Sequence, residues 1–213
     1  MKTIYDQYDK ALLNDLPRAQ FPGRIYIIQS AQEAERAVSY LLTLPILGFD
    51  TETRPSFRRG HTHSVALLQV AGHDCCFLFR LNLMEGLPRP VIRLLEDQTV
   101  TKVGLSLKDD FHNLHHRADF TRGTFIELQD EVKQIGIKDM SLQKIYANLF
   151  GEKISKSQQL SNWEADSLTP AQQLYAATDA WACIRIHEEI TRLLSTRDFR
   201  LQLADVPQCP PCP

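Results

Sequence analysis

The stretch ILGFDTET, residues 46–53, sets an apolar run directly against two carboxylates, and this junction constrains the fold more than any other feature of the chain. Residues two apart on a strand point to the same face, so Asp50 and Glu52 project together from one end of an otherwise buried strand. Two neighbouring like charges repel each other unless something neutralises them. An isolated Asp-x-Glu pair most often marks a strand that emerges into water, so a functional site needs further acids.

Strand-like and helix-like segments alternate along the chain, which predicts an α/β fold. Apolar and β-rich runs predict strands at 24–29, 46–52, 64–72, 74–80, 101–106 and 124–130. Helical spacing and capping residues predict helices at 30–44, 87–96, from about 108, 141–150 and 169–194. Three early strands followed by strand–helix alternation predict a mixed central sheet flanked by helices on both faces.

The two ends of the chain are expected to lie outside this domain. Four apolar residues at helical spacing precede Pro17: Ile4, Tyr8, Leu12 and Leu16. They predict an N-terminal helical arm within residues 1–20. Residues 21–196 are assigned to one globular domain, and residues 197–213 to a C-terminal tail that is expected to be disordered.

Composition excludes several classes of protein. The 213 residues, 43% of them hydrophobic, are enough to bury one core, and the longest apolar runs are far too short to span a bilayer, so no membrane partner is expected. Five cysteines without a disulfide framework favour a reducing, cytoplasmic compartment. The net charge of −2 provides no global basic field for nucleic acid, so charge has to be examined locally.

Two further groups of acids follow the Asp-x-Glu pair. In KVGLSLKDDFHNL a predicted strand leads into a helix that carries Asp109 and Asp110. In LYAATDAW, Tyr175 and Asp179 stand four residues apart and therefore share one face of a predicted helix. Taken alone, each group is also compatible with a solvated helix face.

The ordered set of these motifs resembles the DEDD exonuclease superfamily, and within it ribonuclease D and the Werner-type exonuclease domain. The resemblance covers roughly residues 22–194, through GFDTET, KVGLSLKDDFHNL, SLQKIYANLFGEKISKSQQLSNW and LTPAQQLYAATDAWACIRIHEEI. The acid of the family's second motif lies six residues after a glycine, and counting from Gly104 selects Asp110 over Asp109. The histidine subclass would need His at Leu174, so the chain is identified with the tyrosine subclass.

This resemblance implies a ribonuclease-H-like fold and a metal-dependent 3′–5′ exonuclease that uses two divalent cations, Mg²⁺ or Mn²⁺. Asp50 would bind both ions, Glu52 and Asp179 the ion nearer the nucleophile, and Asp110 the second ion through water. Tyr175 would orient the attacking water. Hard carboxylate oxygens are the ligands that Mg²⁺ prefers, which explains why a buried strand ends in two acids.

Contacts to the substrate are expected next to these motifs. The loop TRPSFRRGHTHS sets Arg54, Arg58 and Arg59 beside Phe57, a mixture suited to phosphates and bases, although a solvated hairpin loop explains it equally well. A second group lies before the last helix: Lys153, Lys156 and Trp163. Of these, Arg54, Arg58, Lys156 and Trp163 are the candidate nucleic-acid contacts, with packing as the alternative role of the tryptophan.

The expected partner is a nucleic acid with a single-stranded 3′ end or a recessed duplex end. DNA is favoured over RNA, because the extra helical domains that follow the catalytic domain of ribonuclease D are not expected in this chain. An exoribonuclease of the ribonuclease D type and a catalytically silent binding domain of the same fold remain the alternatives. Thr53 stands where the Werner-type domain has tryptophan, which makes substrate contacts there different.

Two other patterns carry less weight. His112 and His116 have the i, i+4 spacing of a zinc pair, but no third ligand stands out. Cys209 and Cys212 form a C-x-x-C pair in the proline-rich tail without a second pair to complete a zinc site. Both are interpreted as features unrelated to metal binding.

Overall fold

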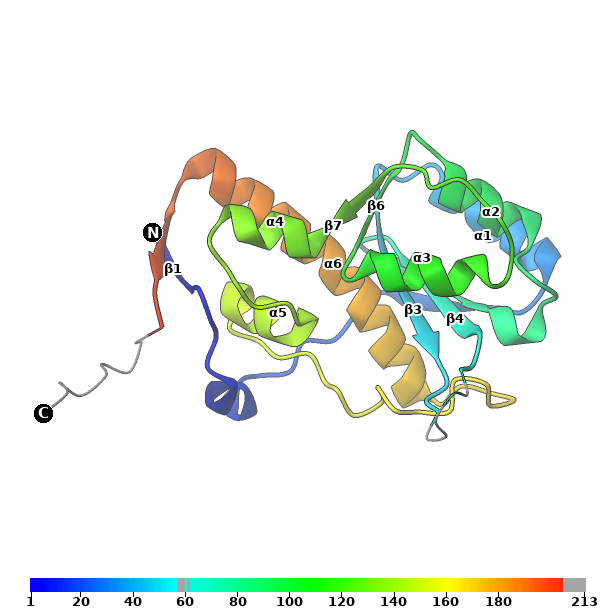
Figure 1. Ribbon diagram of the computed structural model, residues 1–213, viewed down its shortest axis with the longest axis horizontal. Helices are drawn as coiled ribbons and strands as arrows, with labels where there is room; N and C mark the ends of the chain where they lie inside the picture. Colours follow the sequence, from blue (N-terminus) through cyan, green and yellow to red (C-terminus); the bar gives the residue numbers. More distant parts are fainter. Residues whose placement is uncertain (57–59, 61, 205–213) are drawn as a thin grey trace, which may run out of the picture.

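A mixed six-stranded sheet forms the centre of the computed structural model, which describes residues 1–56, 60 and 62–204 (Figure 1). The strand order is β2-β5-β4-β3-β6-β7. The bounds are β2 Arg24–Ile28, β3 Ile46–Thr53, β4 Val65–Ala71, β5 Cys75–Arg80, β6 Thr101–Gly104 and β7 Phe125–Glu127. Strand β4 runs antiparallel to β3 and β5, and the other neighbours are parallel. The predicted mixed sheet is confirmed.

Helices cover both faces of this sheet. The first face packs against α1 (Ala31–Leu41), α2 (Arg89–Glu96) and α3 (Leu107–His115). The second face packs against α6 (Pro170–Thr196), which in turn contacts α4 (Leu128–Gln134) and α5 (Leu142–Phe150) (Figure 1). Every residue of β4 and β5 is buried, as expected for strands that are covered on both sides.

Helix α6 crosses β3 at very short range. A Cβ atom at Gly48 would lie 1.8 Å from the carbonyl oxygen of Ala180, so only glycine allows this approach. A capping box between Thr169 and Gln172 fixes the start of the helix, with Pro170 in its first turn. The close crossing places Asp179, the residue before Ala180, beside the end of β3.

The N-terminal region differs from the helical arm predicted within residues 1–20. Residues Lys2–Tyr5 form strand β1, and Lys10–Asp15 form the 3-10 helix η1, which the side chain of Asp9 caps at the backbone N–H of Ala11. Strand β1 pairs in parallel with β8 (Phe199–Gln202), and Ile4 is fully buried in the core. The helical periodicity was misleading because pairing with a distant strand outweighs local propensity.

The prediction of disorder for residues 197–213 is wrong for the part that forms β8. Phe199 and Leu201 pack against the core, so this segment belongs to the folded unit. Residues 205–213, with Cys209 and Cys212, lie outside the described residues.

The strand predicted at 124–130 is shorter than expected, because β7 ends at Glu127 and α4 begins at the next residue. The Glu127 side chain caps α4 by accepting a hydrogen bond from the backbone N–H of Gln129. This cap starts α4 and so ends the strand at Glu127, whereas the apolar pattern alone predicts a longer strand.

The described part of the chain contains no helix that is long and apolar enough to cross a membrane. Cys75, Cys76 and Cys183 are buried free thiols.

Candidate active site

Three acids from two distant segments meet at the end of β3. Ligand atoms of Asp50, Glu52 and Asp179 all lie within 4.8 Å of one another. They line a cavity of about 300 Å³ together with Tyr175 and Lys156. The period of the strand places the first two acids on one face, and the close crossing of α6 brings the third to them.

Asp110 lies beside this group on α3 without belonging to the set within 4.8 Å. Its carboxylate accepts a hydrogen bond from the hydroxyl of Thr51, the residue between the two acids of β3. Asp110 is partly buried, whereas Asp109 is exposed. The structure thus places Asp110, and not Asp109, next to the carboxylate cluster, as the count from Gly104 predicts.

Glu127 fixes the start of the helix that carries Asp110. Its two carboxylate oxygens accept hydrogen bonds from the backbone N–H groups of Ser106 at 3.0 Å and Leu107 at 2.8 Å. Because Glu127 also caps α4, one side chain links β7, α3 and α4. The position of Asp110 therefore depends on a residue that motif matching did not select.

Burial raises the pKa of every carboxyl in the cluster, and neighbouring acids add to the rise at Asp50 and Glu52. The pKa of Asp50 lies well above its ordinary value, first because of burial and then because Asp110 and Glu52 repel its charge. Burial raises the pKa of Glu52 to about 9, with Asp179 and Asp110 adding to the effect. Burial likewise raises the pKa of Asp110 to about 7.

Asp179, the acid on α6, also has a raised pKa. Burial raises its pKa to about 7, although the Tyr175 hydroxyl and the positive charge of Lys156 oppose the rise. Its Oδ1 atom is buried without a hydrogen-bond partner among the described residues. The cluster is thus a buried concentration of negative charge with unfilled acceptor capacity.

These features fit a divalent cation. None of the ion pairs between described residues includes Asp50, Glu52, Asp110 or Asp179. All four donors are hard carboxylate oxygens, the type that Mg²⁺ and Mn²⁺ prefer. A cation bound there would favour the ionised form of all four carboxyls and so lower their pKa values.

Tyr175 faces the cluster from the first half of α6, where its burial raises the pKa of the phenol well above the ordinary value, with Asp179 and Glu52 adding to the rise. The phenol therefore stays protonated and can donate a hydrogen bond. Trp163 lies behind it, fully buried, with the two ring centroids 6.0 Å apart. Trp163 supports Tyr175 by packing, and its predicted contact with nucleic acid is corrected because no part of the ring is exposed.

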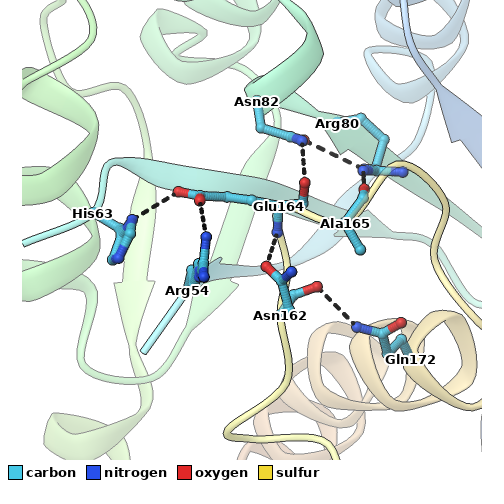
Figure 2. Close-up of polar contacts among 8 residues, drawn as sticks. All are labelled: Arg54, His63, Arg80, Asn82, Asn162, Glu164, Ala165 and Gln172. Atoms are coloured by element: carbon cyan, nitrogen blue, oxygen red, sulfur yellow. Dashed lines mark hydrogen bonds and ion pairs between the residues drawn. The ribbon is translucent and has the colours of Figure 1, made fainter. Parts of the chain in front are cut away.

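The predicted nucleic-acid contact Arg54 is engaged by a carboxylate. Its Nη1 atom lies 3.2 Å from Oε2 of Glu164, and Nδ1 of His63 lies 3.0 Å from Oε1 of the same residue (Figure 2). Glu164 thus links both ends of the loop between β3 and β4. The predicted contact Arg58, with Phe57 and Arg59, lies outside the described residues.

The segment that carries Glu164 is anchored to the sheet. The buried guanidinium of Arg80 donates to the carbonyl of Ala165, and Asn82 donates to the carbonyl of Glu164 (Figure 2). Gln172 on α6 donates to the carbonyl of Asn162 at 3.3 Å. These contacts hold the loop before α6 against the active-site end of β4 and β5.

The two lysines of the preceding segment have different environments. Lys156 lines the active-site cavity, and its charge lowers the pKa of Asp179. The amine of Lys153 instead donates to the backbone carbonyl of Asn14. Lys156 therefore lies at the carboxylate cluster, whereas Lys153 holds the N-terminal segment.

The histidines of α3 gather no metal site in the described part of the chain, where the one group of three possible ligands is the carboxylate cluster. His112 and His116 are exposed, with ring centroids 4.8 Å apart. His115 stacks on Phe120 at 4.2 Å.

Comparisons with known proteins agree with this site. A family model described as 3′-5′ exonuclease matches residues 25–195. The chain is 33% identical over 193 residues to exonuclease 3′-5′ domain-containing protein 2 of Drosophila melanogaster, covering 85% of this chain and 33% of the relative. It is 30% identical over 207 residues to the mouse bifunctional 3′-5′ exonuclease/ATP-dependent helicase WRN, covering 92% of this chain and 15% of the relative.

A solved structure shows the same fold. Escherichia coli RNase D, described as an exoribonuclease involved in structured RNA processing, superposes with a TM-score of 0.69 at 19% identity, over 81% of this chain and 45% of that one. The chain thus spans a third or less of the two curated relatives and just under half of this structure.

Proposed function

The chain belongs to the 3′-5′ exonuclease family of DEDD nucleases, and on that premise we propose that it removes nucleotides one at a time from nucleic-acid 3′ ends, with DNA preferred over RNA. One observation carries the proposal: three carboxylates and a protonated tyrosine from distant segments converge on one cavity. A site of this kind suits phosphodiester hydrolysis, in which negative charge on the phosphate group and on the departing oxygen must be stabilised.

Two bound cations, Mg²⁺ or Mn²⁺, would supply the Lewis acidity that activates a water and stabilises the charge of the departing oxygen. Asp50, Glu52 and Asp179 would hold them, with Asp110 as the fourth carboxylate. In the reaction the water oxygen bonds to phosphorus and the bond from phosphorus to the 3′-oxygen breaks. The released proton passes to that 3′-oxygen, which leaves a shortened strand and a nucleoside 5′-phosphate.

Tyr175 acts by orientation in this proposal. The raised pKa of its phenol makes it a poor general base, because a base must be deprotonated near the working pH. A protonated hydroxyl can instead donate to, or accept from, the attacking water and align it with the phosphorus. Lys156, which already acts on the charge of Asp179, would meet a phosphate oxygen of the substrate.

The preference for DNA rests on the relatives. Identity to mouse WRN is 30% over most of this chain, against 19% for the structure of RNase D. An exoribonuclease is the second candidate, since the superposition with RNase D covers most of the chain. A silent binding domain is disfavoured, because all five residues of the motif are present: three acids lie within 4.8 Å of one another, Tyr175 lines the same cavity, and Asp110 accepts a hydrogen bond from Thr51 beside them.

The test is digestion of three 5′-labelled strands: single-stranded DNA, duplex DNA with a recessed 3′ end, and single-stranded RNA. Each is incubated with Mg²⁺, with Mn²⁺ and with a chelator. The proposal predicts ladders that shorten from the 3′ end, need metal, and form fastest with DNA. Faster shortening of RNA would replace the substrate assignment, and no shortening of any strand by folded protein would overturn the nuclease function.

A further inference from the structure

A second hollow of about 140 Å³ adjoins the active-site cavity. The two share Ile154, Ser155 and Tyr175 in their walls, so the segment before α6 and the first half of α6 both border the two hollows. The nucleotide that is removed would occupy the first cavity. The rest of the strand has to leave that cavity past one of its walls, and this shared wall is a candidate route.

The N-terminal segment forms the outer side of this hollow. Arg18 pairs as a parallel β-bridge with Lys153. The backbone N–H of Ala19 donates to the carbonyl of Lys153 at 2.9 Å, and the N–H of Lys153 donates to the carbonyl of Pro17 at 2.8 Å. The main chain at Arg18 is therefore fixed beside the active site, although the sequence assigned residues 1–20 to a separate arm.

Among the described residues, the side chain of Arg18 has no hydrogen-bond or ion-pair partner. It lines the hollow, it is exposed, and within the described ranges it takes part in no ion pair and no side-chain hydrogen bond. This distinguishes it from Arg54, whose charge Glu164 already balances. A fixed backbone with a free guanidinium is suited to bind an anion.

The remaining lining of the hollow also favours an anion. Its described residues include no aspartate or glutamate. The hydroxyl of Ser157 accepts a hydrogen bond from Ser155 at 3.0 Å and keeps its own proton to donate. Ala171 contributes from the first turn of the 27-residue helix α6, where the helix dipole is positive.

We propose that this hollow binds a backbone phosphate of the substrate strand upstream of the scissile one, with Arg18 as its principal contact. The proposal rests on the exonuclease function, and it makes the N-terminal segment part of the substrate channel. Phosphate is common to DNA and RNA, so the site adds affinity for the strand without selecting the sugar.

The experiment compares Arg18→Ala, Arg18→Lys and wild type on substrates of different length. The matched control is Arg200→Ala, which removes the same charge from an exposed residue of β8. The substrates are a decanucleotide of the faster-degraded type, a dinucleotide with a free 5′-hydroxyl, and thymidine 5′-(p-nitrophenyl phosphate). The last two contain no phosphate upstream of the one that is cleaved.

Arg18→Ala should raise KM for the decanucleotide about tenfold, as expected for loss of one charge-assisted hydrogen bond, with little change in kcat. Its plot of log KM against log salt should lose about 0.7 of slope, the value for one phosphate on a single strand. Both short substrates should be cleaved as by wild type, and Arg18→Lys should recover most of the loss. Arg200→Ala should match wild type throughout.

Equal KM and equal salt slope for Arg18→Ala and wild type on the decanucleotide would overturn the proposal. A loss of equal size on the nitrophenyl ester would also overturn it, because that substrate lacks the upstream phosphate. Failure of wild type to cleave any substrate would instead refute the exonuclease function. In that case anisotropy of a labelled decanucleotide decides the phosphate site, since Arg18→Ala in an Asp50→Asn background must still weaken binding.

Discussion

Removing one charge from the carboxylate cluster should stabilise the metal-free protein, and Glu52→Gln is the sharpest case. Burial and the charges of Asp179 and Asp110 raise the pKa of Glu52 from an ordinary value near 4.5 to about 9. The folded state therefore binds more protons than the unfolded state between these two values. Stability contributed by this group falls as pH rises through that window, and glutamine removes the dependence.

The size of the effect follows from the pKa. A pH of 8 lies about 3.5 units above the ordinary pKa of Glu52. At 1.36 kcal/mol per unit, the upper bound on the stability lost through this carboxyl is about 5 kcal/mol. Glu52 is partly exposed, so solvent screens part of this effect and about 2 kcal/mol belongs to this side chain. For a chain of this length that raises Tm by roughly 4 to 8 °C.

The assay is thermal unfolding in chelator at pH 5, 6.5 and 8, with Asp109→Asn as the control. Asp109 is exposed on the same helix as Asp110, so its substitution should move Tm by under about 1 °C. The gain from Glu52→Gln should shrink toward zero at pH 5 and be reversed by Mg²⁺, which stabilises wild type by binding the folded state. A variant that is destabilised equally at every pH in chelator would refute this reasoning.

Four further substitutions separate catalysis, packing and loop anchoring. Tyr175→Phe should lower kcat roughly ten- to a hundredfold, the effect of losing one hydrogen bond to a charged group. Mg²⁺ should still raise the Tm of this variant as much as that of wild type. Loss of that rise would contradict an orienting role. Gln69→Met should raise Tm by about 4 °C, because both polar atoms of this fully buried side chain lack partners among the described residues; a lower Tm would show that they are satisfied in solution. Arg80→Met should lower the free energy of unfolding by about 2 kcal/mol, because the Ala165 carbonyl loses its donor. Glu164→Gln should lower it by under about 1 kcal/mol, because the ion pairs of Glu164 are partly exposed. Urea unfolding measures both, and a larger loss for Glu164→Gln would reject this account of the loop.

The acids could be predicted because their pattern is local. The strand period places Asp50 and Glu52 on one face, the helix period places Tyr175 and Asp179 together, and the spacing of the second motif in the family that the chain resembles selects Asp110. Each relation spans fewer than seven residues of chain. What joins the three motifs is the crossing of α6 over β3 at Gly48, which only the resemblance to the family could supply from sequence.

The errors arose where distant segments decide the structure. The periodicity at 3–16 is genuine, but pairing of β1 with β8 across nearly the whole chain decides its conformation. The nucleic-acid contact at Arg54 stays a prediction, but its ion pair with Glu164, 110 residues away, is another feature that the sequence did not indicate. Arg18 carries no sequence signal at all, because only the bridge to Lys153 brings it to the active site.

The most direct test of the central claim is the initial rate at which a 5′-labelled oligonucleotide is shortened in Mg²⁺ by wild type, Asp50→Asn and Asp109→Asn. The two variants remove the same charge, one from the cluster and one from the exposed neighbour of Asp110. The account predicts stepwise loss from the 3′ end by wild type and Asp109→Asn, and a rate at least a thousandfold lower for Asp50→Asn, roughly the 4 kcal/mol expected when a metal-binding charge is lost. Equal rates for wild type and Asp50→Asn would contradict it.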